Sequence, residues 1–257
     1  MEKTERLPAM TYAEKQARAE AKRRILLDFL ASGEVFSTVE IAALLLQCSR
    51  RAAQSTVGGL ERDGALKSEE IENAGRKSKI YGITPHGLAL IDKWDMPFHE
   101  LGRTSPAFLA HKLDGQRMRI KAEAAGWTAF VPERLQKMQE SPRERTAAKG
   151  KGKDSEKIPD FIATSPKGDR VAIEIERTIK TPRRYESVLL AHLKSIKAGR
   201  YAFVAYVCPD GLEKLVERAF ARVETIRFEG ENVKVTDSHR ARFAFFSYSK
   251  FAQKKGA

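Results

Sequence analysis

The sequence predicts an α/β (α+β) protein of two units, residues 1–95 and residues 106–250, and three observations support this prediction. Helical spacing dominates the first unit, whereas helices and strands alternate in the second. The run YAFVAYVC at residues 201–208 is almost wholly apolar, as expected of a strand inside a sheet that is covered on both faces. Between the units, residues 95–106 carry two prolines and a glycine, which is typical of a linker.

The chain is strongly basic. Its 257 residues include 47 Lys and Arg against 34 Asp and Glu, a formal net charge of +13. Such a charge favours a polyanionic partner, either nucleic acid or an anionic membrane surface. No apolar run approaches the roughly 20 residues that span a bilayer, and the N-terminus has no hydrophobic signal core. Cys48 and Cys208 are isolated, which indicates reduced thiols. We therefore expect a cytoplasmic protein without membrane insertion.

The first unit is expected to contain three helices, two strands and a closing helix. Ser37 and Glu40 have the spacing of a capping box at the start of the second helix, and Ser49 can cap the third. The expected helices are Thr11–Leu30, Val39–Leu46, Arg50–Asp63 and Pro85–Trp94, and the expected strands are Ala65–Glu72 and Ser78–Thr84.

Three helices followed by a strand hairpin are typical of a winged helix-turn-helix domain, in which the third helix enters the major groove of DNA. Ala53, Val57 and Leu60 form the inner stripe of this helix, so its basic and polar residues face outward. The hairpin turn is basic as well, which suits contact with phosphate. The candidate DNA-binding residues are Arg50, Arg51, Gln54 and Ser55 on the helix and Arg76, Lys77 and Lys79 on the hairpin. An alternative is a winged helix that serves protein contact or dimerisation.

The second unit is expected to begin with a helix, His111–Gly126, and a strand, Trp127–Val131. The inner stripe of that helix is expected to be Leu113, Arg117, Ile120 and Ala124. Residues 132–157 are polar and basic, which predicts a flexible loop that either lies along a phosphate backbone or is a solvated insertion. Later elements are a helix capped by Thr181, a helix from Asp210, edge strands Thr225–Glu229 and Val233–Thr236, and strand Arg242–Tyr248.

An acidic hairpin lies at the centre of the second unit. Strands Ile158–Thr164 and Arg170–Arg177 flank a Ser-Pro-Lys-Gly-Asp turn, which pairs residue 164 with 170, 162 with 172 and 160 with 174. Asp160, Glu174 and Glu176 then share one face. Carboxylates at opposed positions repel unless they hold a cation, and hard oxygen ligands suit Mg²⁺ or Mn²⁺. The alternative is a solvated acidic face on which each glutamate pairs with an arginine.

The same hairpin resembles the PD-(D/E)xK nuclease signature. Pro159-Asp160 is followed, after thirteen residues, by Glu174-Ile175-Glu176, in which Glu176 stands where that pattern usually has lysine. Lys180 is the best substitute for the missing lysine, and Lys194 or Lys197 are alternatives. Arg183 and Arg184, just beyond Lys180, add candidate DNA contacts. No glycine-rich phosphate loop is present, so no nucleotide cofactor is expected.

A narrower resemblance covers nearly the whole chain. The run KIPDFIATSPKGDRVAIEIERTIKTPRRYE, continued by LLAHLKSIKAGRYAFVAYVCP, together with the preceding winged helix, resembles the MobC-type plasmid relaxases and the related replication-relaxation proteins. This resemblance implies metal-dependent, strand-specific nicking of DNA at a plasmid transfer origin, with relaxosome accessory proteins and a coupling protein as partners. It implies Asp160, Glu174 and Glu176 as the acidic catalytic set. The rival interpretation is a DNA-binding accessory protein or transcriptional regulator whose nuclease fold is inactive.

Overall fold

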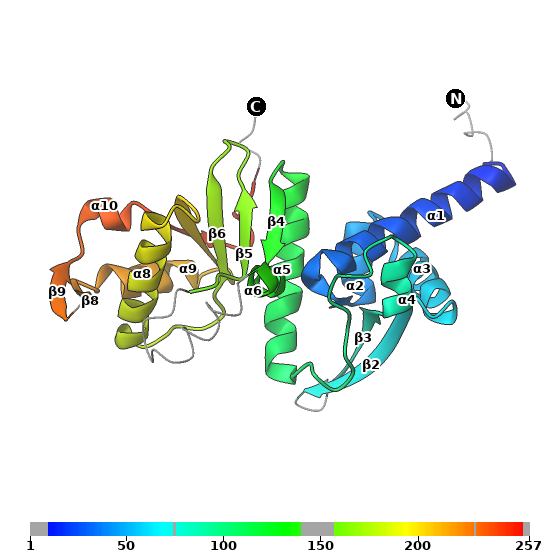
Figure 1. The fold of residues 1–257 in the computed structure, drawn as a ribbon, viewed down its shortest axis with the longest axis horizontal. Coiled ribbons are helices and arrows are strands. Elements are labelled where there is room, and N and C mark those ends of the chain that lie inside the picture. The colour runs from blue at the N-terminus through cyan, green and yellow to red at the C-terminus, as the bar shows by residue number, and fades with distance from the viewer. Residues whose placement is uncertain (1–9, 74–75, 140–156, 229, 254–257) are drawn as a thin grey trace, which may run out of the picture. The chain divides into compact units, whose positions relative to one another are not determined.

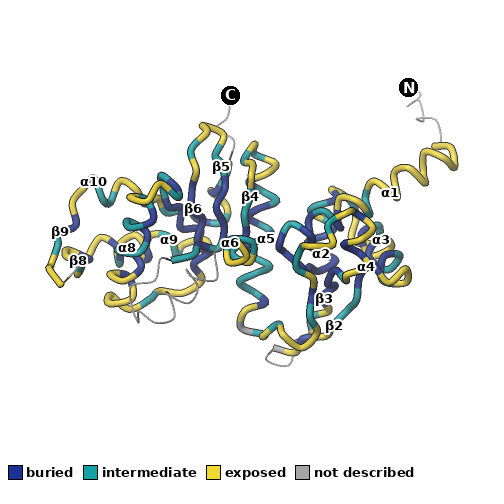
Figure 2. Tube along the Cα trace, in the orientation of Figure 1, coloured by how far each residue is buried: buried dark blue, intermediate teal, exposed yellow. Residues whose placement is uncertain are grey.

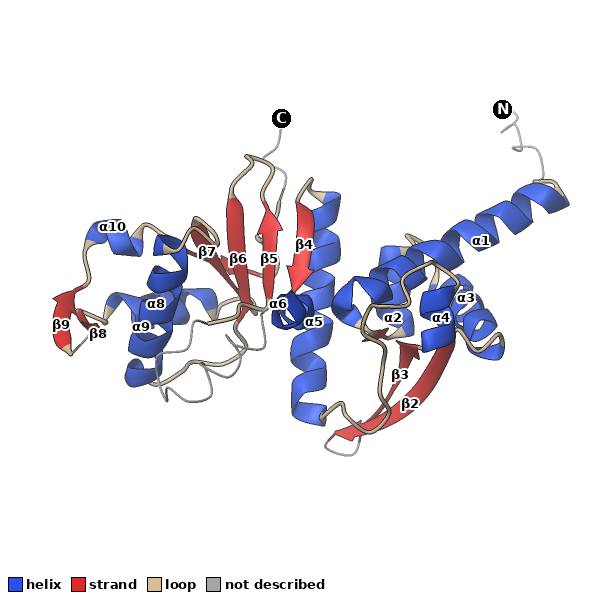
Figure 3. Cartoon of the chain, viewed as in Figure 1, coloured by secondary structure: helices blue, strands red, loops and turns tan. Residues whose placement is uncertain are grey.

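The computed structural model describes residues 10–73, 76–139, 157–228 and 230–253, and it has the mixed α/β class that the sequence predicts. The chain divides into two compact units, Met1–Ser105 and Pro106–Ala257 (Figure 1). Each unit has its own sheet and its own helices (Figure 3).

In the first unit, three helical segments precede a long hairpin. The three-stranded sheet has the order β1-β3-β2, and both of its pairings are antiparallel. Apolar side chains of α1, α2 and α3 are buried with those of the hairpin, among them Leu26, Ile41, Leu60 and Ile80. The elements are α1 (Tyr12–Phe29), η1 (Leu30–Glu34), β1 (Phe36–Ser37), α2 (Val39–Leu45), α3 (Arg50–Arg62), β2 (Leu66–Asn73), β3 (Arg76–Ile83) and α4 (Pro85–Ala89).

The helix caps of this unit follow the sequence in part. Ser49 caps α3, because its hydroxyl accepts a hydrogen bond from the Ala52 N–H at 3.3 Å. At α2 the cap is Thr38, not Ser37, since the Thr38 hydroxyl accepts from the Ile41 N–H. Ser37 cannot serve because it is already paired with β3 in the sheet. The capping box expected from Ser37 is therefore wrong. The closing helix, α4, ends at Ala89, five residues earlier than expected.

The segment expected to be a linker packs against the first unit. His99 is only 2% exposed, and its N–H donates to the Ile83 carbonyl at 2.9 Å. Its Nε2 atom lies 2.9 Å from a carboxylate oxygen of Glu69 on β2. The imidazole ring also lies directly over Gly82 of β3. Residues 96–105 are thus held to the sheet of the first unit by a buried side chain.

Replacing Gly82 with alanine is expected to destabilise the first unit. A Cβ atom at this position would lie 2.2 Å from the His99 ring, so either the ring or the strand must move. Overpacking of this kind costs about 1–3 kcal/mol of unfolding free energy, which urea titration can measure. Gly58→Ala is the matched control, because a Cβ there meets only the tip of Arg62 at 3.7 Å on helix α3. Equal stability of the two variants would contradict the tight packing of His99 on Gly82.

The second unit is built on a five-stranded mixed sheet with the order β10-β7-β6-β5-β4. β4, β5 and β6 pair antiparallel, whereas β6, β7 and β10 pair parallel. The elements are α5 (Pro106–Ala124), β4 (Thr128–Pro132), α6 (Glu133–Gln139), β5 (Phe161–Thr164), β6 (Arg170–Ile175), α8 (Pro182–Lys197), β7 (Phe203–Cys208), α9 (Glu213–Ala221), β8 (Thr225–Phe228), β9 (Glu231–Lys234), α10 (Asp237–Arg240) and β10 (Phe243–Ser247).

Helices cover both faces of this sheet. On one face, Met118 and Ala122 of α5 pack against Ile173 and Ile175 of β6. On the other face, α8 and α9 enclose a second core around Tyr206 of β7. β7 lies between β6 and β10, which agrees with its apolar sequence, and Figure 2 shows β5 and β6 buried along their length. β8 and β9 are short edge strands, as expected, but they pair with each other in a separate two-stranded sheet.

The central hairpin has the predicted register over most of its length. Thr164 pairs with Arg170 and Ile162 with Ala172, as the turn sequence indicates. The ladder ends at the pair Phe161–Ile173, so residue 160 does not continue it opposite residue 174.

Two expectations for neighbouring segments differ from the structure. The buried side of α5 carries Gly115, Met118 and Ala122 in place of the predicted stripe. Part of the predicted loop, Glu133–Gln139, is the helix α6, whereas residues 140–156 lie outside the described residues.

Candidate active site

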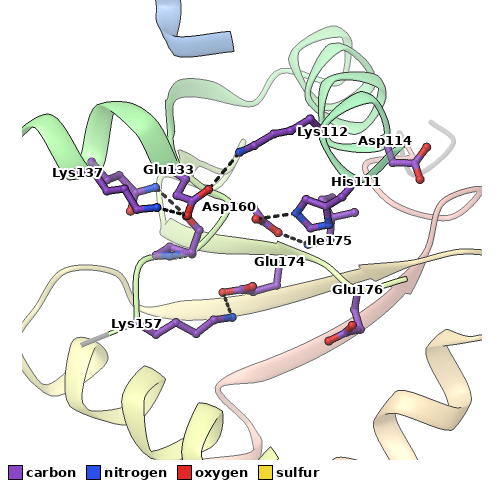
Figure 4. Close-up of polar contacts among 12 residues, drawn as sticks. His111, Lys112, Asp114, Glu133, Lys137, Lys157, Asp160, Glu174, Ile175 and Glu176 are labelled. Atoms are coloured by element: carbon purple, nitrogen blue, oxygen red, sulfur yellow. Dashed lines mark hydrogen bonds and ion pairs between the residues drawn. The ribbon is translucent and has the colours of Figure 1, made fainter. Parts of the chain in front are cut away.

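Asp160 lies at the start of β5, where its side chain joins the hairpin to α5. One carboxylate oxygen accepts a hydrogen bond from the Ile175 N–H at 2.8 Å, and the other lies 2.9 Å from Nε2 of His111 (Figure 4). The Asp160 side chain is 14% exposed and that of His111 is 25% exposed. The Asp160 side chain therefore points toward α5. Strict strand alternation would instead have placed it on one face with Glu174 and Glu176.

Glu174 projects from β6 to the opposite side, beneath α8. Its carboxylate is 9% exposed and forms an ion pair with Lys157 (Figure 4). His192 of α8 is fully buried, and its Nε2 atom lies 3.3 Å from the same carboxylate oxygen. Burial would raise the pKa of Glu174, but the Lys157 ammonium and the His192 imidazole hold that pKa well below its usual range. Glu174 is thus ionised in the folded protein at neutral pH.

The other ring nitrogen of His192 also has a polar partner. Its Nδ1 atom lies 2.7 Å from the Tyr201 hydroxyl, which precedes the central strand β7. His192 thus belongs to the core and also contacts Glu174. Burial lowers the pKa of His192, which favours the neutral ring.

Glu176 lies two residues after Glu174 and is 4% exposed. Lys180 forms an ion pair with it, and the lysine side chain remains 30% exposed. The Lys180 N–H donates to the Tyr185 hydroxyl at 3.1 Å, which fixes the loop between β6 and α8. Tyr185 is fully buried, and burial raises the pKa of its hydroxyl, so this side chain packs in the core. Lys180 is thus placed beside Glu176, and its role as substitute for the motif lysine stays a prediction.

An open cleft of about 380 Å³ lies between the start of α5 and the end of β6. His111 and Phe108 line it from α5, and their rings stack at 5.9 Å. Glu176, Arg177 and Lys180 line it from β6 and the following loop. The cleft therefore combines an imidazole held by a carboxylate with two solvent-accessible cations, Arg177 and Lys180, and the buried carboxylate of Glu176. This combination suits proton transfer and the binding of an anionic group.

The oxygens of the three carboxylates are suitable ligands for a hard cation, but the three side chains do not point toward one common position. Asp160 and Glu174 flank one stretch of β6, because Asp160 bonds the N–H of the residue that follows Glu174. Each carboxylate has its own basic partner: His111, Lys157 or Lys180. Within the residues that the structure describes, no group of three or more His, Cys, Asp and Glu side chains is placed to hold a metal ion. A cation would therefore have to displace one of these partners.

Two residues of this site were not found from the sequence. His111 precedes Asp160 by 49 positions and belongs to the side of α5 that carries Gly115, Met118 and Ala122. Lys157 stands at the end of a stretch with the composition of a loop, which hid its pairing with Glu174. The spacing of four residues between His111 and Gly115 indicates that the two share a side of α5, but it does not point to Asp160.

The predicted DNA-binding residues of α3 lie on its exposed face. Arg50, Arg51, Gln54 and Ser55 are exposed, opposite the buried stripe Ala53, Val57 and Leu60 that the sequence predicted. Arg50 contacts Glu40 of α2 at 3.0 Å, and Gln54 donates to the Tyr81 hydroxyl at 3.4 Å.

The hairpin residues have acidic neighbours. Lys79 lies opposite Glu70 in the ladder and 3.6 Å from Glu61, and Lys77 lies opposite Glu72 and 3.9 Å from Glu70. Arg76 pairs with Asn73, so it belongs to β3 and not to the turn, and its side chain lies outside the described part. Each of these exposed lysines therefore has an acidic side chain within ion-pair distance.

Arg183 and Arg184 are exposed in the first turn of α8, in the second unit. Thr181 is the N-cap residue of α8 and Pro182 occupies the first helical position, as predicted, although the Thr181 side chain makes no cap hydrogen bond.

Cys48 and Cys208 are both free thiols. Among the described residues, none of the helices combines the length and apolar character needed to cross a membrane.

Comparison of the chain with protein-family models, with curated proteins and with solved structures gave no match.

Proposed function

We propose that this protein binds DNA through its first unit and cleaves one DNA strand in the cleft of its second unit, as a plasmid mobilization relaxase would. The observation that carries the proposal is the cleft at the end of β6. There a histidine held by Asp160 faces Lys180 and Arg177 across a space open to solvent.

The order of elements supports both halves of the proposal. In the first unit, three helices precede an antiparallel hairpin and β1 pairs with β3, which is the arrangement of a winged helix-turn-helix. In the second unit the order is helix α5, strand β4, helix α6, the antiparallel hairpin β5–β6, helix α8 and the parallel strand β7, which accommodates a restriction-endonuclease-like core. Asp160 directly precedes β5 and Glu174 lies on the neighbouring strand β6, and these are the two acids that the PD-(D/E)xK resemblance implies.

The chain's own residues supply specific chemical roles. With Nε2 of His111 donating to Asp160, the Nδ1 atom is left to accept a proton from the attacking water or hydroxyl. Lys180 and Arg177 provide positive charge for the scissile phosphate, and stabilise the charge that develops on it. Arg177 is positioned by Asp114 of α5 at 3.2 Å. Glu176 holds Lys180 beside the cleft.

A divalent cation is part of the proposal. Asp160, Glu174 and Glu176 are the carboxylates that the resemblance implies for Mg²⁺ or Mn²⁺. Because Asp160 turns toward α5 and Glu174 toward α8, one ion held by both would require these side chains to leave Lys157 or His111 and turn toward each other. Such an ion polarises the phosphate and activates a nucleophile when it is bound.

The second candidate function is a DNA-binding accessory protein or regulator that does not cleave. It is favoured by the basic partner that each of the three carboxylates already has, because these pairs satisfy the acids without a metal.

Incubation with supercoiled plasmid that carries the DNA neighbouring the gene separates the two functions. A relaxase converts the plasmid to the nicked circle when Mg²⁺ or Mn²⁺ is present, and not in the presence of a chelator. If the protein shifts the same plasmid in a gel but leaves it supercoiled with either ion, the accessory or regulatory function replaces the nuclease.

Replacing Arg51 with alanine is expected to weaken specific DNA binding by about 1–3 kcal/mol if its exposed side chain reads a base edge. Fluorescence anisotropy with the plasmid fragment measures the change, and Arg62→Ala at the far end of α3 is the control. A fragment of residues 1–105, which keeps His99 on its sheet, should bind the same DNA. Normal binding by the Arg51 variant together with no binding by the fragment would place recognition in the second unit.

A further inference from the structure

A basic groove in the first unit lies between α1 and the start of α3. Its volume is about 550 Å³, and it is open to solvent. Lys15, Arg18 and Lys22 line it from α1, and Ser49, Ser55 and Thr56 line it from the start and outer side of α3. Figure 1 shows these two helices beside each other in the first unit, and the whole groove belongs to that unit.

The charge of this groove is uncompensated. Among the described residues that line it, none is acidic. The three basic residues are spaced by three and four positions, so they form one stripe along α1. Like charges at this spacing oppose helix formation, and no ion pair of these three residues with an acidic side chain is found in the described part of the chain. Arg18 contacts only the Met10 sulfur, at 3.7 Å, among the hydrogen bonds of the described residues.

The acidic residues of α1 have partners other than the three cations of the groove. Glu14 accepts a hydrogen bond from the Thr11 N–H at 2.7 Å, Glu20 lies 3.6 Å from Arg23, and Asp28 lies 3.1 Å from Arg24. The helix therefore concentrates free positive charge on the side that faces α3. Ser49 and Ser55 contribute hydroxyl groups to the opposite wall that can donate to an anionic oxygen, whereas the Thr56 hydroxyl already donates to the Ala52 carbonyl at 3.1 Å.

We propose that this groove binds the phosphate backbone of DNA, as a sequence-independent site beside the recognition helix. It rests on the proposed function, because it assumes that α3 meets DNA. Cations in a stripe, facing hydroxyl donors, suit a row of phosphate diesters rather than a base edge. The start of α3, a helix of 13 residues, adds its partial positive charge to that wall. Ser55 belongs both to this groove and to the predicted base-reading face, so the two surfaces are continuous.

The test uses the full chain and a short DNA duplex of mixed sequence, since phosphate contacts do not depend on the target site. Anisotropy titrations over a series of salt concentrations give the slope of log K against log salt. Arg18→Ala should lower the magnitude of this slope by about 0.9, and the Lys15→Ala, Arg18→Ala, Lys22→Ala triple variant by about 2–3. Alanine is the best helix former, so α1 is expected to remain intact in each variant. The charge-retaining Arg18→Lys should keep the wild-type slope.

Arg24→Ala is the matched control, because Arg24 lies nine positions after Lys15 and hence on the opposite side of α1. Its slope should equal that of the wild type. The inference is overturned if the triple variant keeps the wild-type slope, or if Arg24→Ala lowers the slope as much as Arg18→Ala does. In either case wild-type binding to the duplex leaves the proposed function standing, whereas wild-type protein that binds no duplex at low salt overturns both.

Discussion

Replacing Asp160 with asparagine is expected to lower nicking of supercoiled DNA by at least about 100-fold, the range that removal of an acid–base group gives. Asparagine keeps an oxygen that can accept from the Ile175 N–H, so the end of the hairpin should stay folded. It removes the negative charge that holds His111 and that a cation would need. The amount of nicked circle formed with Mg²⁺ measures the loss, and anisotropy measures DNA binding, which should not change.

Asp169→Asn is the matched control for this prediction. Asp169 lies at the opposite end of the same hairpin, next to its turn, so its loss should leave nicking at the wild-type rate. His111→Ala should lower nicking as Asp160→Asn does, because the two side chains act as a pair. Wild-type nicking by both the Asp160 and His111 variants would show that this cleft is not the site of cleavage.

The sequence predicted the hairpin well because local rules determine it. The turn residues set its register, and β-branched residues on alternate positions place Ile173 and Ile175 against α5. The same rule failed for Asp160 because the ladder stops one residue after it, at Phe161. Beyond that point the pleat no longer determines where a side chain points, and hydrogen bonds to His111 and Ile175 do so instead.

Contacts between segments far apart in the sequence were harder to predict. Glu174 meets Lys157 and His192, which lie 17 positions before it and 18 after it, and only the packing of α8 on the sheet brings them together.

The start of α2 shows the same limit on a smaller scale. Ser37 and Thr38 can both cap a helix, and pairing of β1 with β3 decides between them. To predict the basic groove, one must know how α1 packs against α3, and sequence periodicity alone does not give that packing.

Replacing Lys157 with methionine is expected to destabilise the second unit by about 2–4 kcal/mol, because it leaves the buried carboxylate of Glu174 without its ammonium partner. The lysine is 22% exposed, so the cost should be somewhat below that of a fully buried pair. Urea unfolding at neutral pH measures it. Lys137→Met is the matched control, since Lys137 pairs with Glu133 at 2.6 Å but is 55% exposed, and its loss should cost less than about 1 kcal/mol.

The pH dependence of this difference tests its electrostatic origin. The pKa of Glu174 is lowered in the folded protein, so its ion pair contributes stability above the unfolded pKa of about 4.3 and loses it as the pH falls toward the folded pKa. The gap in unfolding free energy between wild type and Lys157→Met should therefore be widest at neutral pH and should narrow below about pH 4. Adding Glu174→Gln to the variant should recover most of the loss at neutral pH, since no buried charge then remains. A gap that stays constant with pH, or one no larger than that of Lys137→Met, would mean that Lys157 contributes packing and not the charge that Glu174 requires.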